Sequence, residues 1–327
     1  MGTVRAIAAT AWGGVDVIEV VEVASRPPGR GEAVVAVHAT AISPFDLKRA
    51  AGMMGRDEDM LPLRLGNEVA GIVTAVGADA IGFDGAPLAA GDEVLGHWLP
   101  GAQADEITVP ADTLLRKPSA LGFAEAAGLL GSGTTAVHTL DAARVHDGDV
   151  VLVHGVSGAV GGMVAQLANL RGARVIGTAS PGRHQRLRAM GVQPVAYGDG
   201  LGERVRALAP GGVSAAVDTV GTDEAITVSL ELVADPARVV TIANYQAALA
   251  AGAQALGPGP ETERVRTAAR LDLVRLAAAG RLAVTVAGEF PLEQARAAYT
   301  VLAGGHSGGK LVLRPTPSPA SRSSRSV

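Results

Sequence analysis

A glycine-rich turn between a strand-like and a helix-like segment constrains the fold of this chain more than any other feature. The apolar run 150–153 leads into the turn 154–162, a helical pattern follows at 163–170, and a second apolar run covers 173–176. Strand, glycine turn, helix and strand in this order form the unit that binds dinucleotides in parallel sheets. We expect the cofactor phosphates to contact Gly155, Ser157, Gly158, Ala159, Val160 and Gly161.

Gly155, Gly158 and Gly161 of this turn are spaced three residues apart, and each has its own physical reason. One permits the tight turn, one lets the backbone approach a pyrophosphate, and one lets the helix pack close to its strand. The helix start then offers free N–H groups and the positive end of a dipole to the phosphates.

The region from 150 to 243 alternates between strand-like and helix-like runs. Such alternation predicts an α/β fold, a Rossmann doubly wound parallel sheet with helices on both faces. The strand-like runs are 150–154, 174–178, 194–197, 214–218 and 238–243. The helix-like runs are 160–171, 183–190, 202–208 and 224–233.

The first 120 residues are β-rich, with turns of glycine and proline between the strands. We expect strands at 4–10, 15–23, 32–41, 68–76 and 93–95, and a helix at 123–130. The stretch after 244 is a loop or a degenerate last strand; a helix at 261–279, a strand at 282–286, a helix at 292–302 and a strand at 310–313 follow. We predict two domains, 1–122 with 259–327 and 123–258, and a disordered tail after Pro315.

Composition excludes several classes of protein. Hydrophobic residues make up 48% and charged residues 18% of the chain, which is typical of a folded globular protein. The net charge of −4 shows no footprint of nucleic-acid binding. The chain has no cysteine, which excludes disulfides and thiolate–zinc sites. No apolar run is long enough to span a bilayer and no signal-like leader opens the chain, so we expect a cytoplasmic protein without a membrane partner.

The end of the second Rossmann strand selects between NAD and NADP. An NAD site usually has Asp or Glu there to bind the ribose diol. No acidic residue occurs between Asp149 and Asp199, and Ser180 and Arg183 follow the strand. A hydroxyl and a guanidinium suit a 2′-phosphate, which a carboxylate would repel. The sequence therefore predicts NADPH, although the arginines here could also form a solvated helix face.

Several motifs together resemble the medium-chain dehydrogenase/reductase superfamily, specifically its zinc-free quinone oxidoreductase branch. The resemblance covers about residues 1 to 314 and implies a β-rich, GroES-like catalytic domain beside the Rossmann domain. It also implies a homodimer joined through the edge of the cofactor-domain sheet, near 239–258. The motifs are Pro44-Phe45-Asp46, Gly66-Asn67-Glu68-Val69-Ala70-Gly71, Ala90-Gly91-Asp92-Glu93-Val94, Gly133-Thr134-Thr135-Ala136, Ser157-Gly158-Ala159-Val160-Gly161 and Gly308-Gly309-Lys310.

Two positions separate the chain from the zinc members of that superfamily. Those members have a cysteine where this chain has Ser43 and a histidine where it has Asn67. Neither residue is a usual zinc ligand, so we expect no metal site. Without a Lewis acid, hydride transfer to quinones or α,β-unsaturated carbonyls fits better than oxidation of simple alcohols. The developing enolate oxygen then needs a hydrogen-bond donor and a proton source.

The resemblance also points to residues near the reaction, with departures. Relatives often have Asn at the position of Ser43, Tyr at that of Lys48 and a second Tyr near Met54. Lys48, Ser43 and Tyr245 are our candidate catalytic residues, although Lys48 could be a surface lysine and Tyr245 could only cap the sheet. We expect Asp46 to be structural and the methionine-bearing loop 52–65 to line the cleft. The cofactor contacts that the resemblance implies are Thr135, Tyr197, Val220, Gly221, Ala243, Asn244 and Lys310.

The leading hypothesis is an NADPH-dependent quinone or enone reductase that needs no metal. A second reading is an enoyl reductase that tailors a polyketide-type natural product, since it shares the mechanism and differs only in the pocket. A third is a non-catalytic NADPH-binding redox sensor, which the altered polar residues near Lys48 would allow. The substrate, the stereochemistry, the proton donor and the size of the oligomer stay open at this point.

Overall fold

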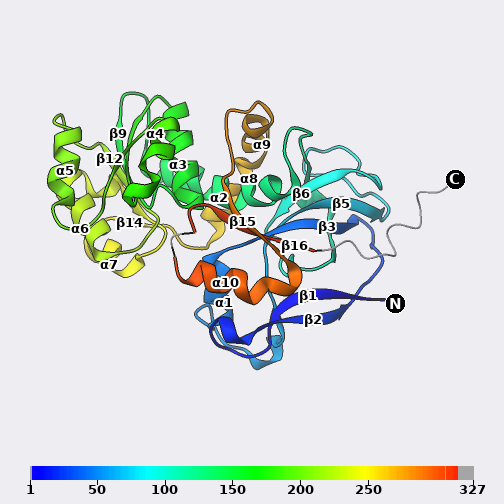
Figure 1. Ribbon diagram of the computed structural model, residues 1–327. Coiled ribbons are helices and arrows are strands. Elements are labelled where there is room, and N and C mark those ends of the chain that lie inside the picture. Colours follow the sequence, from blue (N-terminus) through cyan, green and yellow to red (C-terminus); the bar gives the residue numbers. More distant parts are fainter. Residues whose placement is uncertain (1, 306, 316–327) are drawn as a thin grey trace. The chain divides into compact units, whose positions relative to one another are not determined.

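The computed structural model describes residues 2–305 and 307–315 (Figure 1). The predicted disordered tail after Pro315 lies outside these residues. The chain divides into two compact units: residues up to Gly131 together with those from Val274 on, and residues 132–273. The predicted domain boundaries at 122/123 and 258/259 stay a prediction, because they concern independent folding rather than compactness.

The unit of residues 132–273 contains a six-stranded, fully parallel sheet, which confirms the predicted α/β fold. Its strand order is β11-β10-β9-β12-β13-β14, so the chain reverses direction across the sheet beside β9. Ligands of such sheets bind outside the carboxyl ends of the strands at this switch point. The strands are β9 (Val150–His154), β10 (Arg174–Thr178), β11 (Val192–Val195), β12 (Ala215–Asp218), β13 (Val239–Thr241) and β14 (Gln254–Ala255).

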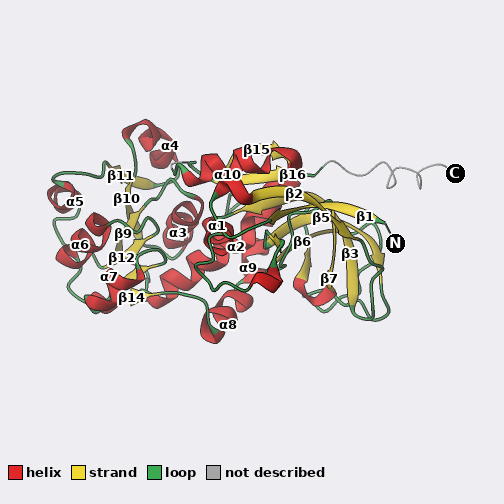
Figure 2. Cartoon of the chain, turned by 90° about the horizontal axis from the view of Figure 1, so that it is seen from below, coloured by secondary structure: helices red, strands yellow, loops and turns green. Residues whose placement is uncertain are grey.

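Helices cover both faces of this sheet. Figure 2 shows α3 and α4 on one face and α5 and α6 on the other. Leu152, Ile176 and Ala216 of the central strands are fully buried and pack in one core with Val205. The helices are α3 (Ala159–Leu170), α4 (His184–Ala189), α5 (Leu201–Leu208), α6 (Asp223–Leu232), α7 (Tyr245–Ala250), α8 (Pro260–Ala268) and α9 (Arg270–Ala278).

The other unit is β-rich, as predicted. A seven-stranded sheet has the order β15-β16-β3-β5-β6-β8, with β7 paired to β3, and a three-stranded sheet has the order β2-β1-β4. The strands are β1 (Thr3–Ala9), β2 (Ile18–Ala24), β3 (Glu32–Ile42), β4 (Leu63–Arg64), β5 (Glu68–Val76), β6 (Glu93–His97), β7 (Glu106–Pro110), β8 (Leu114–Arg116), β15 (Val286–Pro291) and β16 (Lys310–Arg314). The helices of this unit are α1 (Pro44–Ala50) and α10 (Ala295–Ala303), and α2 (Phe123–Ala142) begins in it and continues into the other unit.

Several segments differ from their predicted form. The helix expected at 123–130 continues to Ala142, because the small residues that follow Leu130 are buried and tolerate the helix. The helix expected at 261–279 is two helices that meet at Ala269. The strand expected at 282–286 only begins at Val286. The stretch after Asn244 forms α7 and the edge strand β14. No helix among the described residues is long and apolar enough to cross a membrane.

Candidate cofactor and catalytic sites

The turn after β9 has a backbone that only glycine adopts without strain. Gly155 has a φ of +74°, and a Cβ there would lie 2.5 Å from Cγ2 of Val220. Its N–H donates to Oγ1 of Thr178 at 3.1 Å, which fixes the turn to the end of β10. Glycine at position 155 is therefore needed both for the positive φ and for the close approach of the chain segments that follow β9 and β12.

The start of α3 presents backbone amides at this same point. Gly158 is the N-cap and no side chain caps the helix among the described residues. A Cβ at Gly161 would lie 2.3 Å from the Gly155 carbonyl oxygen, so the helix packs directly on the turn. The first amides of a helix have no partner within it and carry the positive end of its dipole. Their arrangement fits a pyrophosphate, as the sequence predicts for Ser157, Ala159 and Val160 in the same turn.

The end of β10 lacks a carboxylate, as expected. Ser180 is partly exposed and is the N-cap of a 3₁₀ turn, Pro181–Arg183, in which its own side chain makes no capping hydrogen bond. Thr178 is buried and engaged by the Gly155 amide. The side chains of this strand end are thus a hydroxyl at Ser180 and the guanidinium of Arg183, which is partly exposed.

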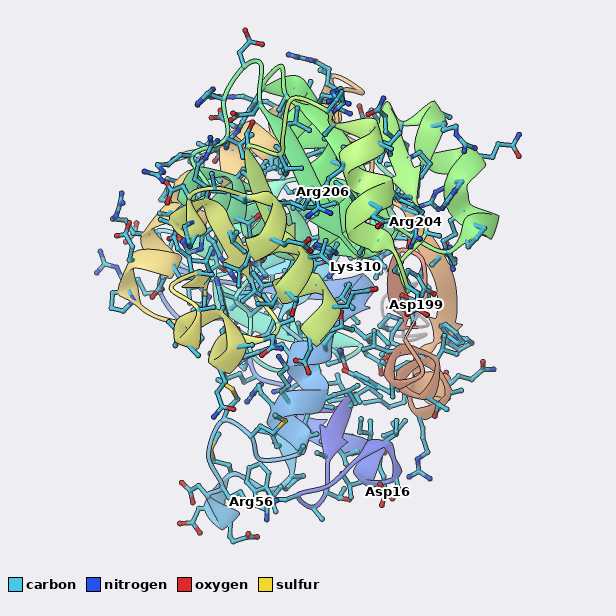
Figure 3. All side chains as sticks on the ribbon, turned by 90° about the vertical axis from the view of Figure 1, so that its left-hand side faces the viewer. Asp16, Arg56, Asp199, Arg204, Arg206 and Lys310 are labelled. Carbon is cyan, nitrogen blue, oxygen red and sulfur yellow. The ribbon has the colours of Figure 1, made fainter. Side chains whose placement is uncertain are left out.

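Tyr197 follows β11, the neighbour of β10, and is 48% exposed. Because Thr178 pairs with Val195 in the parallel register, Tyr197 and Ser180 leave the same edge of the sheet. Arg204 of α5 holds the loop around the tyrosine by donating to the carbonyls of Ala196, Gly198 and Asp199. Figure 3 shows the Arg204 side chain beside Asp199. The Tyr197 phenol therefore lies exposed on a loop that the hydrogen bonds of Arg204 hold in place.

Asp218 at the end of β12 organises the next loop. Its side chain is fully buried, and Oδ1 accepts from the N–H groups of Val220 and Gly221 at 2.8 and 2.9 Å. Oδ2 accepts from the hydroxyl of Thr241, at the end of β13, at 2.6 Å. A buried carboxylate is stable only when donors surround it, and here two donors come from the loop after β12 and one from the end of β13.

The same threonine organises the loop after β13. Thr241 Oγ1 accepts from the N–H groups of Ala243 and Asn244 at 3.1 and 3.2 Å. The Asn244 amide in turn donates to the Gly221 carbonyl at 3.2 Å. The network brings together the predicted cofactor contacts Val220, Gly221, Ala243 and Asn244.

His154 supports Asp218 from the end of β9. Its Nε2 lies 3.0 Å from Oγ of Ser229, whose hydroxyl donates to the Ala225 carbonyl at 2.6 Å, so we assign the imidazole proton to Nε2. Burial lowers the pKa of His154 to about 4, against the opposing effect of Asp218. The imidazole is therefore neutral at pH 7. Sequence reasoning missed His154, Asp218 and Thr241, although each is a polar residue at the carboxyl end of an apolar strand.

In the β-rich unit, Asp46 joins the two positions at which zinc members have metal ligands. Its Oδ2 accepts from the N–H and hydroxyl of Ser43 at 2.8 and 3.0 Å. Its Oδ1 accepts from the Gly66 N–H at 3.2 Å and from the Asn67 amide at 3.4 Å. Burial raises the pKa of Asp46, and the hydrogen bonds from Ser43 and Gly66 oppose that rise. Asp46 thus closes a capping box at the start of α1, in agreement with the expected structural role.

The two candidate lysines of this unit differ in their surroundings. Lys48 lies on α1 and is partly exposed. Lys310, labelled in Figure 3, is 6% exposed and forms a buried ion pair with Glu68, whose other oxygen accepts from the Gly131 N–H at 3.0 Å. The Lys310 ammonium already has a carboxylate partner. A contact of Lys310 with the cofactor stays a prediction, and such a contact would add to the ion pair with Glu68 rather than replace it.

The candidates on α2 and α7 lie in the unit of residues 132–273. Thr135 is 7% exposed on α2. Tyr245 begins α7, is 37% exposed, and donates from its phenol to the Leu256 carbonyl at 3.3 Å. Burial raises the pKa of Tyr245, so the phenol stays protonated at neutral pH. A role of Tyr245 in catalysis stays a prediction.

The methionine-bearing loop lines a cavity within its own unit. The cavity has a volume of about 310 Å³. Its lining residues are Trp12, Arg49, Met54, Gly55, Arg56, Asp57, Met60 and Leu63. Met54 and Met60 are half exposed, which suits an adaptable apolar wall. Within the described ranges, no group of three or more His, Asp or Glu side chains is arranged to hold a metal ion.

Two family models match the chain. Residues 29–119 match the alcohol dehydrogenase GroES-like domain, and residues 190–313 match the zinc-binding dehydrogenases. A segment of the phthioceranic/hydroxyphthioceranic acid synthase of Mycobacterium tuberculosis is 32% identical over 320 residues, which cover 92% of this chain. The chain spans only 15% of the length of that synthase.

Solved structures with the same fold cover nearly the whole chain. A quinone oxidoreductase from Coxiella burnetii is 27% identical, with a TM-score of 0.80 over 96% of this chain and 99% of its own. A mycobacterial protein solved in complex with NADPH is 28% identical, with a TM-score of 0.81 over 95% of this chain and 100% of its own. Together with the two family models and the glycine turn, these similarities show that the chain belongs to the medium-chain dehydrogenase/reductase superfamily of oxidoreductases.

Proposed function

We propose that this chain is an NADPH-dependent reductase that transfers hydride to a quinone or an α,β-unsaturated carbonyl without a metal ion. The observation that carries the proposal is the start of α3, where uncapped amides meet the turn at Gly155. The neighbouring strand end, with Ser180 and Arg183 and no acid, favours the 2′-phosphate of NADP over the free diol of NAD. The mycobacterial relative complexed with NADPH supports the same choice.

The nucleotide would be held by three sets of groups in the unit of residues 132–273. The amides of Ala159 to Gly161 would bind the pyrophosphate, Ser180, Arg183 and Tyr197 the adenosine end, and the loops fixed by Asp218 the nicotinamide end. When bound, the nicotinamide supplies the hydride. Thr135 and Lys310 are further proposed contacts.

The hydrogen bonds of the candidate residues divide the catalytic roles among them. The Ser43 hydroxyl donates its proton to Asp46, so its remaining capacity is to accept a hydrogen bond and to orient a ligand. The Tyr245 proton is directed at Leu256. Lys48 is our first choice for the group that stabilises the developing enolate oxygen, because a cationic donor stabilises that charge most strongly. We propose Lys48 as donor, Ser43 as orienting residue and Tyr245 as second donor.

Zinc independence follows, in this proposal, from the chemistry of the ligand positions. Ser43 and Asn67 both donate to Asp46, and neither offers the thiolate or imidazole that zinc prefers. A conjugated acceptor needs no Lewis acid to accept hydride, because the charge spreads onto its carbonyl oxygen. Quinones and enones are the substrate classes that satisfy this condition.

A narrower candidate is an enoyl reductase acting on polyketide-type intermediates. The observation that favours it is the 32% identity to a mycobacterial acid synthase over 92% of this chain. We further propose a homodimer joined through the edge strand β14, which is two residues long and ends the sheet. An exposed strand edge offers unpaired backbone groups to a second copy.

Oxidation of NADPH, followed by its absorbance against a panel of quinones, enones and enoyl thioesters, tests the function. We expect turnover with at least one conjugated acceptor and none with simple ketones, both before and after treatment with a chelator. Tight NADPH binding without oxidation by any acceptor would contradict the enzyme and favour a redox sensor.

A further inference from the structure

Two arginines of α8 lie in opposite surroundings. Arg264 forms a bidentate pair with Glu261, with N···O distances of 2.7 and 2.9 Å, and both side chains are about 70% exposed. Arg266, two residues on, is partly buried, and its Nε is fully buried without a hydrogen-bond partner in the described part of the chain. Burial lowers the pKa of Arg266. Glu261 therefore pairs with the exposed Arg264 and not with the partly buried Arg266.

A second buried nitrogen faces the same region from α2. His138 is 7% exposed, and its Nδ1 is buried without a hydrogen-bond partner among the described residues. Burial lowers the pKa of His138, and the charge of Arg266 lowers it further, against the opposing effects of Asp141 and Glu261. Arg266 also acts on the pKa of Tyr245. Side chains of α2, α7 and α8 thus lie close enough for the charge of Arg266 to act on His138 and Tyr245.

Several buried cations among the described residues have carboxylate partners, whereas the partly buried Arg64 donates to the Gly101 carbonyl. Lys310 pairs with Glu68, and Arg238, 17% exposed, donates to Asp149 at 2.6 Å. Withdrawing a guanidinium from water without a counter-ion is unfavourable, and the group keeps its charge at any physiological pH. No carboxylate lies within ion-pair distance of Arg266 among the described residues. Such an uncompensated cation is a feature that functional sites share.

We propose that Arg266, with His138 beside it, forms a subsite for a phosphate or carboxylate group of the substrate. The inference rests on the proposed function and narrows it, because neutral quinones would gain nothing from this subsite. The position of Arg266 agrees with this role. Arg266 acts on Tyr245, which directly follows Asn244, and the loop of Asn244 is a proposed cofactor contact. The substrate class is a conjugated carbonyl that carries an oxyanion, such as an enoyl thioester on a phosphorylated arm.

Two matched pairs of substrates isolate the anion. Crotonyl-pantetheine phosphate and crotonyl-pantetheine differ only in the phosphate, and monoethyl and diethyl fumarate differ in one carboxylate. We expect the wild-type kcat/KM to favour the anionic member of at least one pair by about tenfold or more, the usual effect of one charge-assisted hydrogen bond. Which pair responds distinguishes a phosphate from a carboxylate.

The variants Arg266→Gln and Arg264→Gln make the assignment specific. Arg266→Gln should abolish the preference for the anionic member and leave kcat/KM of the neutral member unchanged. Arg266→Lys should restore part of that preference. Arg264→Gln should retain all of it. Equal kcat/KM within both pairs for the wild type would overturn the subsite. A larger NADPH Kd in Arg266→Gln, with the same loss on both members of each pair, would assign the anion to the cofactor and overturn the substrate role.

Direct calorimetric binding of the two pantetheine thioesters separates this inference from the proposed function. If the NADPH-bound protein reduces neither thioester, the proposed reductase activity on these substrates is contradicted. Tighter binding of the phosphorylated thioester that depends on Arg266 would then still support the anion subsite, whereas equal binding of the two thioesters would refute it.

Discussion

At the scale of residues, cofactor choice depends on a few side chains at one strand end. Ser180 follows β10 in a turn where an NAD-binding protein usually places a carboxylate. The side chain is partly exposed, so a substitution there changes the local charge and leaves the core intact.

Ser180→Asp should exchange the cofactor preference. A carboxylate beside the 2′-phosphate repels it and can accept from a free ribose diol, so the Kd for NADPH should rise by about tenfold or more while that for NADH falls. Fluorescence titration of both nucleotides measures the change. Ser180→Ala is the control for the lost hydroxyl and should alter the Kd by only a few fold. An unchanged ratio of the two Kd values would show that the adenosine end binds elsewhere.

Lys48 is the second test at this scale. Lys48→Met keeps the aliphatic stem and removes the charge, so the kcat at saturating substrate should fall by about tenfold to a hundredfold if the lysine stabilises the enolate. NADPH affinity should stay within a factor of two. Lys48→Arg, which retains a cationic donor, should recover part of the activity, and full activity of Lys48→Met would remove Lys48 from the mechanism.

At the scale of elements, the ends of three strands form one hydrogen-bonded unit. Asp218 of β12 and Thr241 of β13 hold the two loops that follow these strands, and Asn244 joins the loops directly. Neutral His154 of β9 is the register partner of Asp218 and bonds to Ser229. Pre-organised loops bind a ligand more tightly because less motion is lost on binding.

Thr241→Val should loosen both loops. The isosteric change removes one donor from Asp218 and one acceptor from the Ala243 and Asn244 amides, so the free energy of unfolding should fall by roughly 1–3 kcal/mol. The Kd for NADPH should rise several fold. Thr139→Val is the matched control, since Thr139 is equally buried but bonds only within α2. Equal effects of both variants on the Kd would contradict the positioning role of Thr241.

His154 makes the stability of the folded protein depend on pH. Because the pKa of His154 is about 4 in the folded chain and about 6.5 in the unfolded chain, the unfolded state binds more protons between these values. Its contribution to stability, on the order of 3 kcal/mol, should be complete above pH 6.5 and should be lost as the pH falls towards 4. Urea unfolding at pH 7 and pH 5 should show a smaller difference for His154→Gln than for wild type. A difference for His154→Gln equal to that of the wild type would refute the assignment.

At the scale of the whole molecule, the sequence predicts the two architectures because each has a simple period. Buried parallel strands alternate with helices, and apolar runs mark them clearly from Val150 to Thr241. The break at Ala269 and the short strands β7 and β8 escaped prediction, because the apolar pattern continues through the break and three to five residues carry little signal.

The polar networks could not be predicted for a different reason. Thr241 and Asp218 are 23 residues apart in the sequence and meet only through strand pairing, and the Lys310–Glu68 pair spans 242 residues. The chain shows which residues are polar, but burial and register decide which of them pair. The glycine turn could be predicted because all its residues are close together in the sequence.

Titration of the purified protein with NADPH and NADH, beside a Gly161→Leu variant, tests the central claim most directly. We predict that the wild type binds NADPH with a micromolar or lower Kd and NADH at least about tenfold more weakly. We predict that a side chain 2.3 Å from the Gly155 carbonyl abolishes binding while the β-rich unit stays folded. Absence of binding of either nucleotide to the wild type, or undiminished binding to the variant, would contradict the account.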